Sequence, residues 1–498
     1  MMGGCGTAIA ATIAIKIPPF HKLNVLIQIH YYVTITRKFL KILPQSGKTC
    51  FPRCFTERRV MLLCYNAIIE TKQGRIALNK MTRRTFIQIC ATALMALGLG
   101  RCIPAGAAGR IIRYPRQIIT GDSATSRTIM WQADGGRQGA AFVLTAPDGR
   151  QQSFSPEANT LLQDDTTTTF YTVRLSDLTP DTHYKGSIRM ADETLALPVV
   201  TAASGLSSFE ALLIDDSQCG ETYEPFAQLL AKILVRHPQA AFLADIGDLT
   251  DNGQSAWHWD SFLSVLTAGH AKDIPFAPVM GNHECYGLDW QFALPRRYLA
   301  AFAVPDNGSR DFSGYYYSFD YGPAHFIVLN TQFEELDGLK PGLLQDELLW
   351  LKHDATATKQ PWKIVLMHKD VIAYDEYQPG TGHTGGISDV GHDFMKAFDV
   401  LGIDLVLTGH MHTYRNRGHI YDKTPSDHGP TYLMFGPAGN ERYKVPPDTV
   451  FDKVSLDQSD PGRYRNYMTL AVTPTKCIAT CHLEDGSTVD RVVLTKDA

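Results

Sequence analysis

The sequence predicts an α/β protein in which an N-terminal β-sandwich precedes a layered α/β domain of β-sheets flanked by helices. Three observations predict this class. Residues 110–203 read as short strands separated by turns, with no helical pattern of useful length between them. From about residue 207, short apolar runs alternate with segments of helical periodicity, as in layered α/β domains. After Tyr467 the chain reads as strands again, with a hairpin turn at 484–486.

The composition is that of a folded, globular chain. The 498 residues are 44% hydrophobic and 20% charged, and the formal net charge is −4. These ordinary proportions exclude a disordered, collagenous or coiled-coil chain. Because there is no overall basic excess, no nucleic-acid partner is expected.

Residues 81–107 have the ordered features of an export signal. Arg83 and Arg84 precede an apolar run, and the small residues that end at Ala107 suit cleavage after that position. The segment resembles a twin-arginine (Tat) signal peptide, which implies the Tat export machinery as a partner and a periplasmic or secreted location in a bacterium. The alternative interpretation is a buried helix within a larger fold.

Residues 1–80 contain no uninterrupted apolar stretch long enough to span a bilayer. No stable membrane span is therefore expected in the mature protein. Our hypothesis is that residues 1–80 are an over-extended N-terminus and that Met81 is the true start. Sequencing the N-terminus of the precursor tests this hypothesis, and residues before Met81 in that precursor refute it.

The cysteines that follow the expected cleavage site are Cys219, Cys285, Cys477 and Cys481. Cys477 and Cys481 are four apart in an expected strand, which places them too far from each other to bond. Cys219 and Cys285 each follow a polar loop. A disulfide between these two and a pair of separate, packed thiols are both compatible with the sequence.

Within the expected sandwich, strands are predicted at 128–131 and 170–175, where β-branched and aromatic residues gather. Turn-forming residues lie at 146–149 and 179–181. The stretch 178–184 resembles the end of a fibronectin type III-like domain, in which a proline turn leads into a strand with an inward-packing Tyr.

The expected α/β domain, residues 207–495, begins with a buried strand and then alternates strands with helices. Its apolar runs are 211–214, 240–246, 276–280, 326–329, 364–367 and 405–407. The clearest helix is predicted around 226–234, where apolar residues recur three and four positions apart. Similar spacing indicates helices around 348–351 and 394–401.

Polar clusters follow five of these apolar runs, at the strand ends where ligands bind in α/β sheets. The clusters are Asp215–Gln218, Gly247–Asp248, Gly281–Glu284, His368 and Gly409–His412. Carboxylate, amide and imidazole groups together suit Mn, Fe or Zn. They exceed the needs of one ion, so we expect two transition metal ions, divalent or trivalent, bridged by one carboxylate.

The five blocks, in this order, resemble the calcineurin-like metallophosphoesterase superfamily. The sandwich and the Tyr-rich segment 314–319 resemble its purple acid phosphatase branch, and the resemblance covers roughly residues 110–495. It implies acid phosphatase-like hydrolysis of small phosphate monoesters, with a metal-bound hydroxide as the nucleophile.

The resemblance also implies roles for individual residues. Six would be metal ligands: Asp216, Asp248, Asn282, His368, His410 and His412. Asp248 would bridge the ions, Asp216 and His412 would bind the first, and the remaining three would complete the second. We favour Asp216 over its neighbour Asp215. His283 would be catalytic, either donating a proton to the leaving oxygen or steadying the phosphate.

Two positions depart from the family pattern. Gln218 stands where many superfamily members have His, and Asp251 stands where the purple branch has a Tyr ligand. Both are candidate metal ligands or supporting residues. Without the tyrosinate there is no basis for purple colour, and we expect the first ion to bind more weakly than the second.

Residues close behind the last block are candidates for binding substrate. Tyr414, Arg415 and Arg417 follow it, and Arg can hold a phosphate through two hydrogen bonds. Pairing of these side chains with other residues is the alternative.

Two rival functions remain at this point. Within the same superfamily, the chain could be a phosphodiesterase or a nucleotidase. From another class, it could be a non-enzymatic cell-surface binding protein that carries a degenerate phosphatase domain. The departures at Gln218 and Asp251 favour the second rival, and the otherwise intact blocks oppose it.

Overall fold

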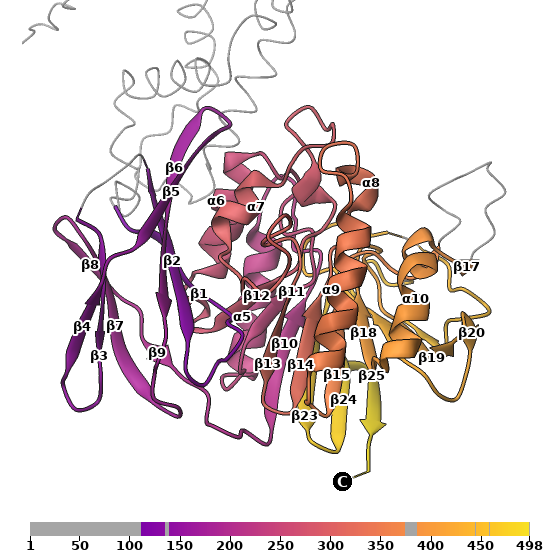
Figure 1. Cartoon of the computed structure of the whole chain (residues 1–498). Helices are drawn as coiled ribbons and strands as arrows, with labels where there is room; N and C mark the ends of the chain where they lie inside the picture. The colour runs from indigo at the N-terminus through magenta and orange to yellow at the C-terminus, as the bar shows by residue number, and fades with distance from the viewer. Residues whose placement is uncertain (1–110, 135–138, 374–385, 444, 458, 498) are drawn as a thin grey trace, which may run out of the picture. The chain divides into compact units, whose positions relative to one another are not determined.

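The computed structural model describes residues 111–134, 139–373, 386–443, 445–457 and 459–497 (Figure 1). The segment 1–80 and the expected signal peptide at 81–107 lie outside these residues. Within the described part of the chain, no helix is long and apolar enough to cross a membrane.

The N-terminal region consists of strands arranged in two sheets (indigo to purple in Figure 1). The strands are β1 (Arg113–Ile118), β2 (Arg127–Asp134), β3 (Ala141–Thr145), β4 (Gln151–Phe154), β5 (Glu157–Gln163), β6 (Thr166–Leu175), β7 (His183–Met190), β8 (Glu193–Ala196) and β9 (Val199–Val200). The buried side chains of Trp131, Tyr171, Phe142 and Ile188 belong to one apolar cluster between the sheets. The β-rich N-terminal part of the predicted fold class is therefore confirmed.

The turn that leads into β7 is fixed by a tyrosine. Tyr184 is buried, and its hydroxyl accepts a hydrogen bond from the backbone N–H of Thr179 at 2.8 Å. This is the inward-packing Tyr that the sequence predicts after the proline turn. The resemblance of this region to a fibronectin type III-like domain stays a prediction.

One sheet runs through both the N-terminal region and the α/β region. Its strand order is β25-β24-β23-β10-β11-β12-β1-β2-β6-β5. The junction is the parallel pair of β1 and β12, with Gln117 opposite Pro275 and Ile118 opposite Phe276. This sheet therefore contains strands from both sides of the domain boundary expected near residues 203–207, and the sequence does not predict such a shared sheet.

The remaining strands of this sheet are β10 (Phe209–Ile214), β11 (Leu243–Asp245), β12 (Pro275–Pro278), β23 (Asn466–Thr473), β24 (Lys476–Leu483) and β25 (Thr488–Thr495). The turn between β24 and β25 is the predicted hairpin, where Gly486 has φ +89° and donates its N–H to the Leu483 carbonyl. Such a φ suits glycine because it lacks a Cβ.

A second large sheet faces the first. Its strands are β13 (Tyr317–Tyr321), β14 (Ala324–Val328), β15 (Trp362–Leu366), β18 (Leu405–Thr408), β21 (Thr431–Met434), β19 (Arg415–Tyr421), β20 (Thr424–Pro425) and β22 (Val454–Ser455). A small separate pair joins β16 (Ile372–Ala373) to β17 (Gly386–Ile387). Neighbouring β14 residues Phe326 and Ile327 enter different core clusters, because successive strand side chains point to opposite faces.

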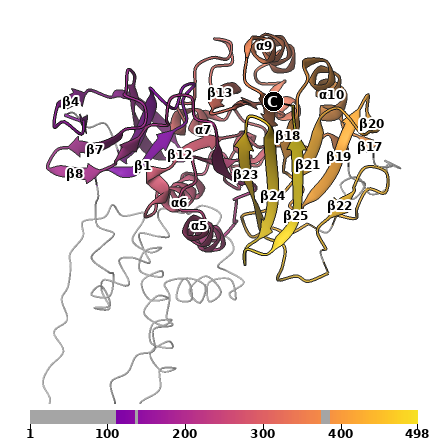
Figure 2. The same cartoon turned by 90° about the horizontal axis from the view of Figure 1, so that it is seen from below.

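Helices cover the outer faces of the two sheets (Figure 2). They are α5 (Glu224–Arg236), α6 (Ala256–Leu266), α7 (Arg296–Ala301), α8 (Phe333–Leu336), α9 (Leu343–Ala357) and α10 (Asp389–Leu401), with single turns at Ala271–Asp273 and His283–Cys285. In α5, Phe226, Leu229 and Ile233 are fully buried in the core with the first sheet, on the predicted apolar face. In α10, Phe394 and Phe398 pack against the second sheet. The layered α/β class is confirmed.

The structure decides between a Cys219–Cys285 disulfide and two separate thiols, which the sequence leaves open. Cys219, Cys285, Cys477 and Cys481 are all buried, free thiols. Cys219 and Cys285 are therefore separate packing residues. Cys477 and Cys481 both lie in β24 and stay unbonded, as their spacing predicts.

A buried histidine joins the second sheet to the helix that covers it. His325 of β14 contacts Asp320 of β13 at 2.6 Å and Asp354 of α9 at 2.8 Å. Burial lowers the pKa of His325, but the two carboxylates outweigh it and raise that pKa to about 9. Its charged form thus holds α9 against the sheet.

We expect His325→Gln to remove about 2 kcal/mol of stability at pH 7. Because the folded pKa of His325 lies above its unfolded value, its contribution is complete below about pH 6.5 and is lost as the pH rises through about 9. Urea unfolding midpoints from pH 6 to 9.5 measure this. His353→Gln, at an exposed site on α9, is the control. Parallel pH profiles for wild type and His325→Gln would contradict the prediction.

Candidate metal centre

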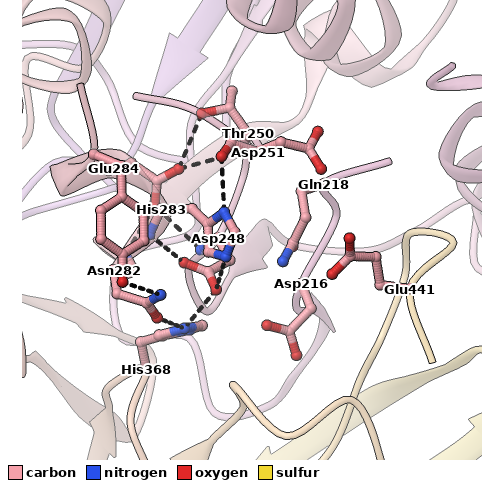
Figure 3. A network of polar contacts seen from close by, with 12 residues as sticks. Asp216, Gln218, Asp248, Thr250, Asp251, Asn282, His283, Glu284, His368 and Glu441 are labelled. Atoms are coloured by element: carbon pink, nitrogen blue, oxygen red, sulfur yellow. Dashed lines mark hydrogen bonds and ion pairs between the residues drawn. The ribbon is translucent and has the colours of Figure 1, made fainter. Parts of the chain in front are cut away.

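The five predicted polar blocks follow the carboxyl ends of β10, β11, β12, β15 and β18. Figure 3 shows residues of the first four blocks close together. Backbone hydrogen bonds join them. The N–H of Asp216 donates to the Gly247 carbonyl at 3.1 Å, and the N–H of Gln218 donates to the Asp248 carbonyl at 3.0 Å. The Gly409 N–H donates to the His368 carbonyl at 2.9 Å. Main-chain hydrogen bonds therefore hold the first block to the second and the fourth block to the fifth.

One group of donor side chains surrounds Asp248. Its Oδ2 lies 3.0 Å from His368 Nε2, which is also 3.1 Å from Asn282 Oδ1. Asp248, His368 and His410 offer ligand atoms that all lie within 4.8 Å of one another. These four side chains are the bridging residue and the second-site ligands that the family resemblance implies.

A second group surrounds Asp216. Its Oδ1 lies 3.5 Å from His412 Nε2, and Gln218 Nε2 lies 3.5 Å from the same nitrogen. Asp215, Asp216 and His368 form another set of ligand atoms within 4.8 Å. His368 thus links the two groups, and Gln218 lies among the residues expected to hold the first ion.

The imidazoles of His368 and His412 are oriented as metal-binding imidazoles usually are. His368 Nδ1 donates to the Ile246 carbonyl at 3.0 Å, and His412 Nδ1 donates to the Glu441 carbonyl at 3.1 Å. A carbonyl can only accept, so in its neutral form each ring keeps its lone pair on Nε2, which faces the carboxylates. The Tyr443 ring stacks on His412 at 4.0 Å and further fixes it.

Several buried polar atoms of the site have no hydrogen-bond partner within the described residues. They are both carboxylate oxygens of Asp216, both of Asp215, Gln218 Oε1 and His410 Nδ1. Buried polar atoms are normally paired, and buried carboxylates need a cation nearby. Unpaired oxygen and nitrogen acceptors around a common space fit transition metal ions.

The backbone is strained at four of the predicted ligands. Asp216 and Asp248 have φ 49°, His410 has φ 73° and His412 has φ 52°. Non-glycine residues rarely adopt this left-handed region, and such strain gathers at functional sites.

Two glycines make space for the ligands. A Cβ on Gly409 would lie 1.2 Å from Asp215 Oδ2, and a Cβ on Gly247 would lie 2.5 Å from His368 Nδ1. Gly247 also has φ +117°. The glycines of the Gly-Asp and Gly-His-x-His blocks are therefore required by close approach.

Burial and neighbouring charges shift the pKa values of the site residues. Burial raises the pKa of Asp215 well above its usual range. Burial also opposes ionisation of Asp248, but His368 outweighs it and holds the pKa of Asp248 below its usual range. Burial lowers the pKa of His368, but Asp248 outweighs this and raises it. Burial and the His368 charge lower the pKa of His410, which leaves a neutral imidazole.

His283 lies beside the bridging carboxylate with one nitrogen available. Its Nδ1 donates to the Asp251 carbonyl at 2.8 Å, and its backbone N–H donates to Asp248 Oδ1 at 2.8 Å. Its Nε2 is 3.9 Å from Asp248 Oδ2. Burial lowers the pKa of His283, but Asp248 and the Asp251 carbonyl outweigh it and raise that pKa. The ring is 18% exposed, whereas Asp248 is 2% exposed, so His283 can meet a substrate.

Glu284 fastens two of the blocks together. Its carboxylate accepts backbone N–H groups of Gly281, Asp248, Leu249 and Thr250 at 2.8–3.2 Å. It therefore shapes the loop that presents Asp248. It does not face the six predicted ligands, Asp215 and Gln218, which together we call the donor set.

The Asp251 side chain is directed away from the donor set. Its Oδ2 accepts the Gly220 N–H at 2.7 Å and lies 2.9 Å from His258 Nδ1 and 3.3 Å from the Tyr223 hydroxyl. Of the two roles that the sequence allows for Asp251, this geometry favours support over ligation.

Tyr414, Arg415 and Arg417 do not face the site as substrate-binding residues. All three are at most 1% exposed. Arg417 pairs with Asp370 at 2.6 Å, and Arg415 pairs with Asp452 at 3.1 Å. The Tyr414 hydroxyl donates to Asp490 at 2.8 Å. Their positions correct the predicted substrate role in favour of its alternative, pairing inside the protein.

Three features of the site escape sequence reasoning. Asp215, over which the sequence favours Asp216, also belongs to a group of ligand atoms within 4.8 Å. The Glu441 carbonyl and the Tyr443 ring both hold His412. The signal for this last pair is the polar segment 439–443, which follows β21 just as the other blocks follow their strands.

Comparison with known proteins agrees with the fold. The family model described as calcineurin-like phosphoesterase matches residues 178–414. Purple acid phosphatase 23 of Arabidopsis thaliana is 29% identical over 215 residues, which are 42% of this chain and 41% of that protein. Acid phosphatase type 7 of Danio rerio is 28% identical over 39% of this chain and 43% of its own length. The chain thus spans less than half of these curated relatives.

A solved structure shares the fold. The purple acid phosphatase from yellow lupin (Lupinus luteus) seeds has a TM-score of 0.63 and 18% identity, and the match covers 78% of this chain and 74% of that one.

Proposed function

We propose that this chain hydrolyses phosphate monoesters at a binuclear metal centre, as a member of the calcineurin-like phosphoesterase superfamily with purple acid phosphatases among its relatives. The observation that carries the proposal is the convergence of buried, unpaired acceptors with two imidazoles whose Nε2 atoms face carboxylates.

The donor groups divide between two ions. Asp216 and His412 would hold the first, with the Gln218 oxygen as an additional ligand. Asn282, His368 and His410 would hold the second, and Asp248 would bridge them. When bound, two such ions lower the pKa of water and offset charge on phosphoryl oxygens.

The protein itself supplies the proton for the leaving oxygen. The Asp251 carbonyl fixes His283 Nδ1 as a donor, which leaves Nε2 facing the side of Asp248 where the ester would lie. A protonated Nε2 can hydrogen-bond the ester oxygen and transfer its proton as the P–O bond breaks. Asp251 then acts as a positioning residue for His283 and not as a metal ligand.

We also propose that the protein is exported to the periplasm or secreted through a twin-arginine signal at 81–107. The supporting observations are the ordered arginines, apolar run and small residues of that segment.

Metal analysis with turnover tests the proposed activity. We expect about two Mn, Fe or Zn ions per chain and hydrolysis of p-nitrophenyl phosphate that chelation abolishes and added metal restores. Bis(p-nitrophenyl) phosphate tests the diesterase alternative in the same assay. Absence of metal and of turnover, even after adding Mn, Zn and Fe, would contradict the proposal, and a clear diester preference would replace monoesters with diesters.

A further inference from the structure

A short loop directly after the Gly-Asn-His-Glu block carries exposed apolar side chains. Leu288 is 51% exposed, Trp290 is 57% exposed and Phe292 is 45% exposed. Exposed large apolar groups scattered singly need no explanation, but three within five residues at the mouth of a polar site mark a binding surface. We call residues 286–292 the aromatic loop.

The aromatic loop is in direct contact with the catalytic candidate His283. The Tyr286 ring lies 5.4 Å from the His283 ring and the Trp290 ring lies 6.3 Å from it, both close to perpendicular. Phe292 stacks on Tyr286 at 5.9 Å. The Asn282 amide donates to the Tyr286 hydroxyl at 3.5 Å. The aromatic surface is therefore continuous with the donor set.

The loop is built to hold this shape. Tyr286 and Phe292 form an antiparallel bridge, and the Gly287 N–H donates to the Gln291 carbonyl at 2.7 Å. The Asn252 amide donates to the Gly287 carbonyl at 2.6 Å. Trp290 has φ 62°, a conformation that is costly for a bulky residue and persists only where the surroundings impose it. Trp290 is thus presented to solvent by an ordered turn.

The position of His283 determines which part of a substrate contacts the aromatic loop. The His283 ring lies between Asp248 and the aromatic loop, so an ester whose phosphate lies at the predicted ligands has its organic part next to this ring. The organic part of the substrate then extends across Tyr286 and Trp290, whose rings flank His283. The loop offers flat apolar faces and one acidic side chain, Asp289, and no basic one, so it suits an uncharged ring better than a further anionic group.

We propose that the aromatic loop binds a planar aromatic ring in the leaving group, so that the preferred substrates are phosphomonoesters of nucleosides or phenols. This inference rests on the proposed phosphomonoesterase function and adds its substrate class. Stacking on an aromatic side chain is insensitive to the details of the ring, because every nucleobase and every phenol has a π face.

Kinetics of Trp290→Ala test the proposal in the full chain. We expect kcat/KM for adenosine 5′-monophosphate to fall about tenfold, and the ratio of that value to the one for glycerol 2-phosphate to fall nearly as much. Both substrates have alkyl leaving oxygens, so the ratio isolates the ring. Phenyl phosphate distinguishes nucleoside esters from phenol esters. If kcat/KM falls for both adenosine 5′-monophosphate and phenyl phosphate, the loop binds any aromatic ring. If it falls for the nucleotide alone, the loop binds a nucleobase. Leu349→Ala removes a similarly exposed apolar side chain from α9 and is the control.

A binding measurement keeps this proposal separate from the activity. Phenylphosphonate and methylphosphonate have a C–P bond and are not hydrolysed as esters. We expect calorimetry to show about tenfold tighter binding of phenylphosphonate, and Trp290→Ala to remove that preference. Equal affinity of the two phosphonates for wild type, or equal losses for all three substrates in Trp290→Ala, would overturn the proposal. If wild type hydrolyses none of the esters, the proposed function fails and the phosphonate comparison still decides the ring site.

Discussion

Asp248→Asn is expected to lower kcat toward p-nitrophenyl phosphate by on the order of 10³-fold, equivalent to about 4 kcal/mol of transition-state stabilisation. Asp248 Oδ2 lies 3.0 Å from Nε2 of His368, the residue common to both donor groups, and Asp248 Oδ1 accepts the His283 N–H. The amide keeps the size of the side chain but removes the negative charge that two cations would share. We therefore expect the metal content to fall from about two ions per chain to one or none.

The matched control is Asp404→Asn, which makes the same chemical change at the opposite end of β18. Asp404 pairs with Lys496 at 2.7 Å and accepts the Lys363 N–H, so it stabilises structure away from the donor set. Its variant is expected to keep the metal content and kcat of wild type. Asp248→Asn protein that keeps both ions and wild-type turnover would show that Asp248 does not bridge.

His283→Ala is expected to have the second largest effect, and the size of the loss depends on the leaving group. An alkyl alkoxide is a poor leaving group and needs a proton, so we expect a loss of about 10³-fold for glycerol 2-phosphate. The p-nitrophenolate ion leaves unaided, so the loss for p-nitrophenyl phosphate is expected to be only about tenfold. The ratio of kcat values for the two esters, measured in each variant, is the readout.

The His283→Ala comparison separates the two roles that the sequence allows. Equal losses for both esters would mean that His283 steadies the phosphate and does not donate the proton. His353→Ala, at an exposed position on α9, is the control for removal of a histidine and is expected to change neither value.

The sequence predicts much of this fold because its signals are local. The apolar face of Phe226, Leu229 and Ile233 requires only helical spacing, and the ends of buried strands are marked by the polar blocks themselves. The donor set is predictable for the same reason, since each block follows its strand within a few residues. The resemblance to a known family then assigns a role to the residues of each block.

The remaining features depend on partners distant in the chain. The sequence makes Arg417 a candidate for binding phosphate, whereas in the structure Asp370 and Asp452 pair with it. The sequence also makes Asp251 a candidate metal ligand, whereas its carboxylate accepts the Gly220 N–H and pairs with His258. No local pattern predicts either pairing, because the partners come together only when separate strands and loops pack. Asp215 and Asp216 are adjacent, and the local pattern alone does not show that both reach a donor set.

The parallel pairing of β1 with β12 makes the catalytic region dependent on the N-terminal strands. A fragment that starts near residue 207 would leave β12 as a bare edge, with the main-chain groups around Pro275 and Phe276 open to pairing with another molecule. Exposed apolar edges of this kind promote aggregation. The two regions therefore do not behave as interchangeable modules: gene fusions, domain swaps and shortened expression clones retain solubility only when they keep the first strands together with the catalytic ones.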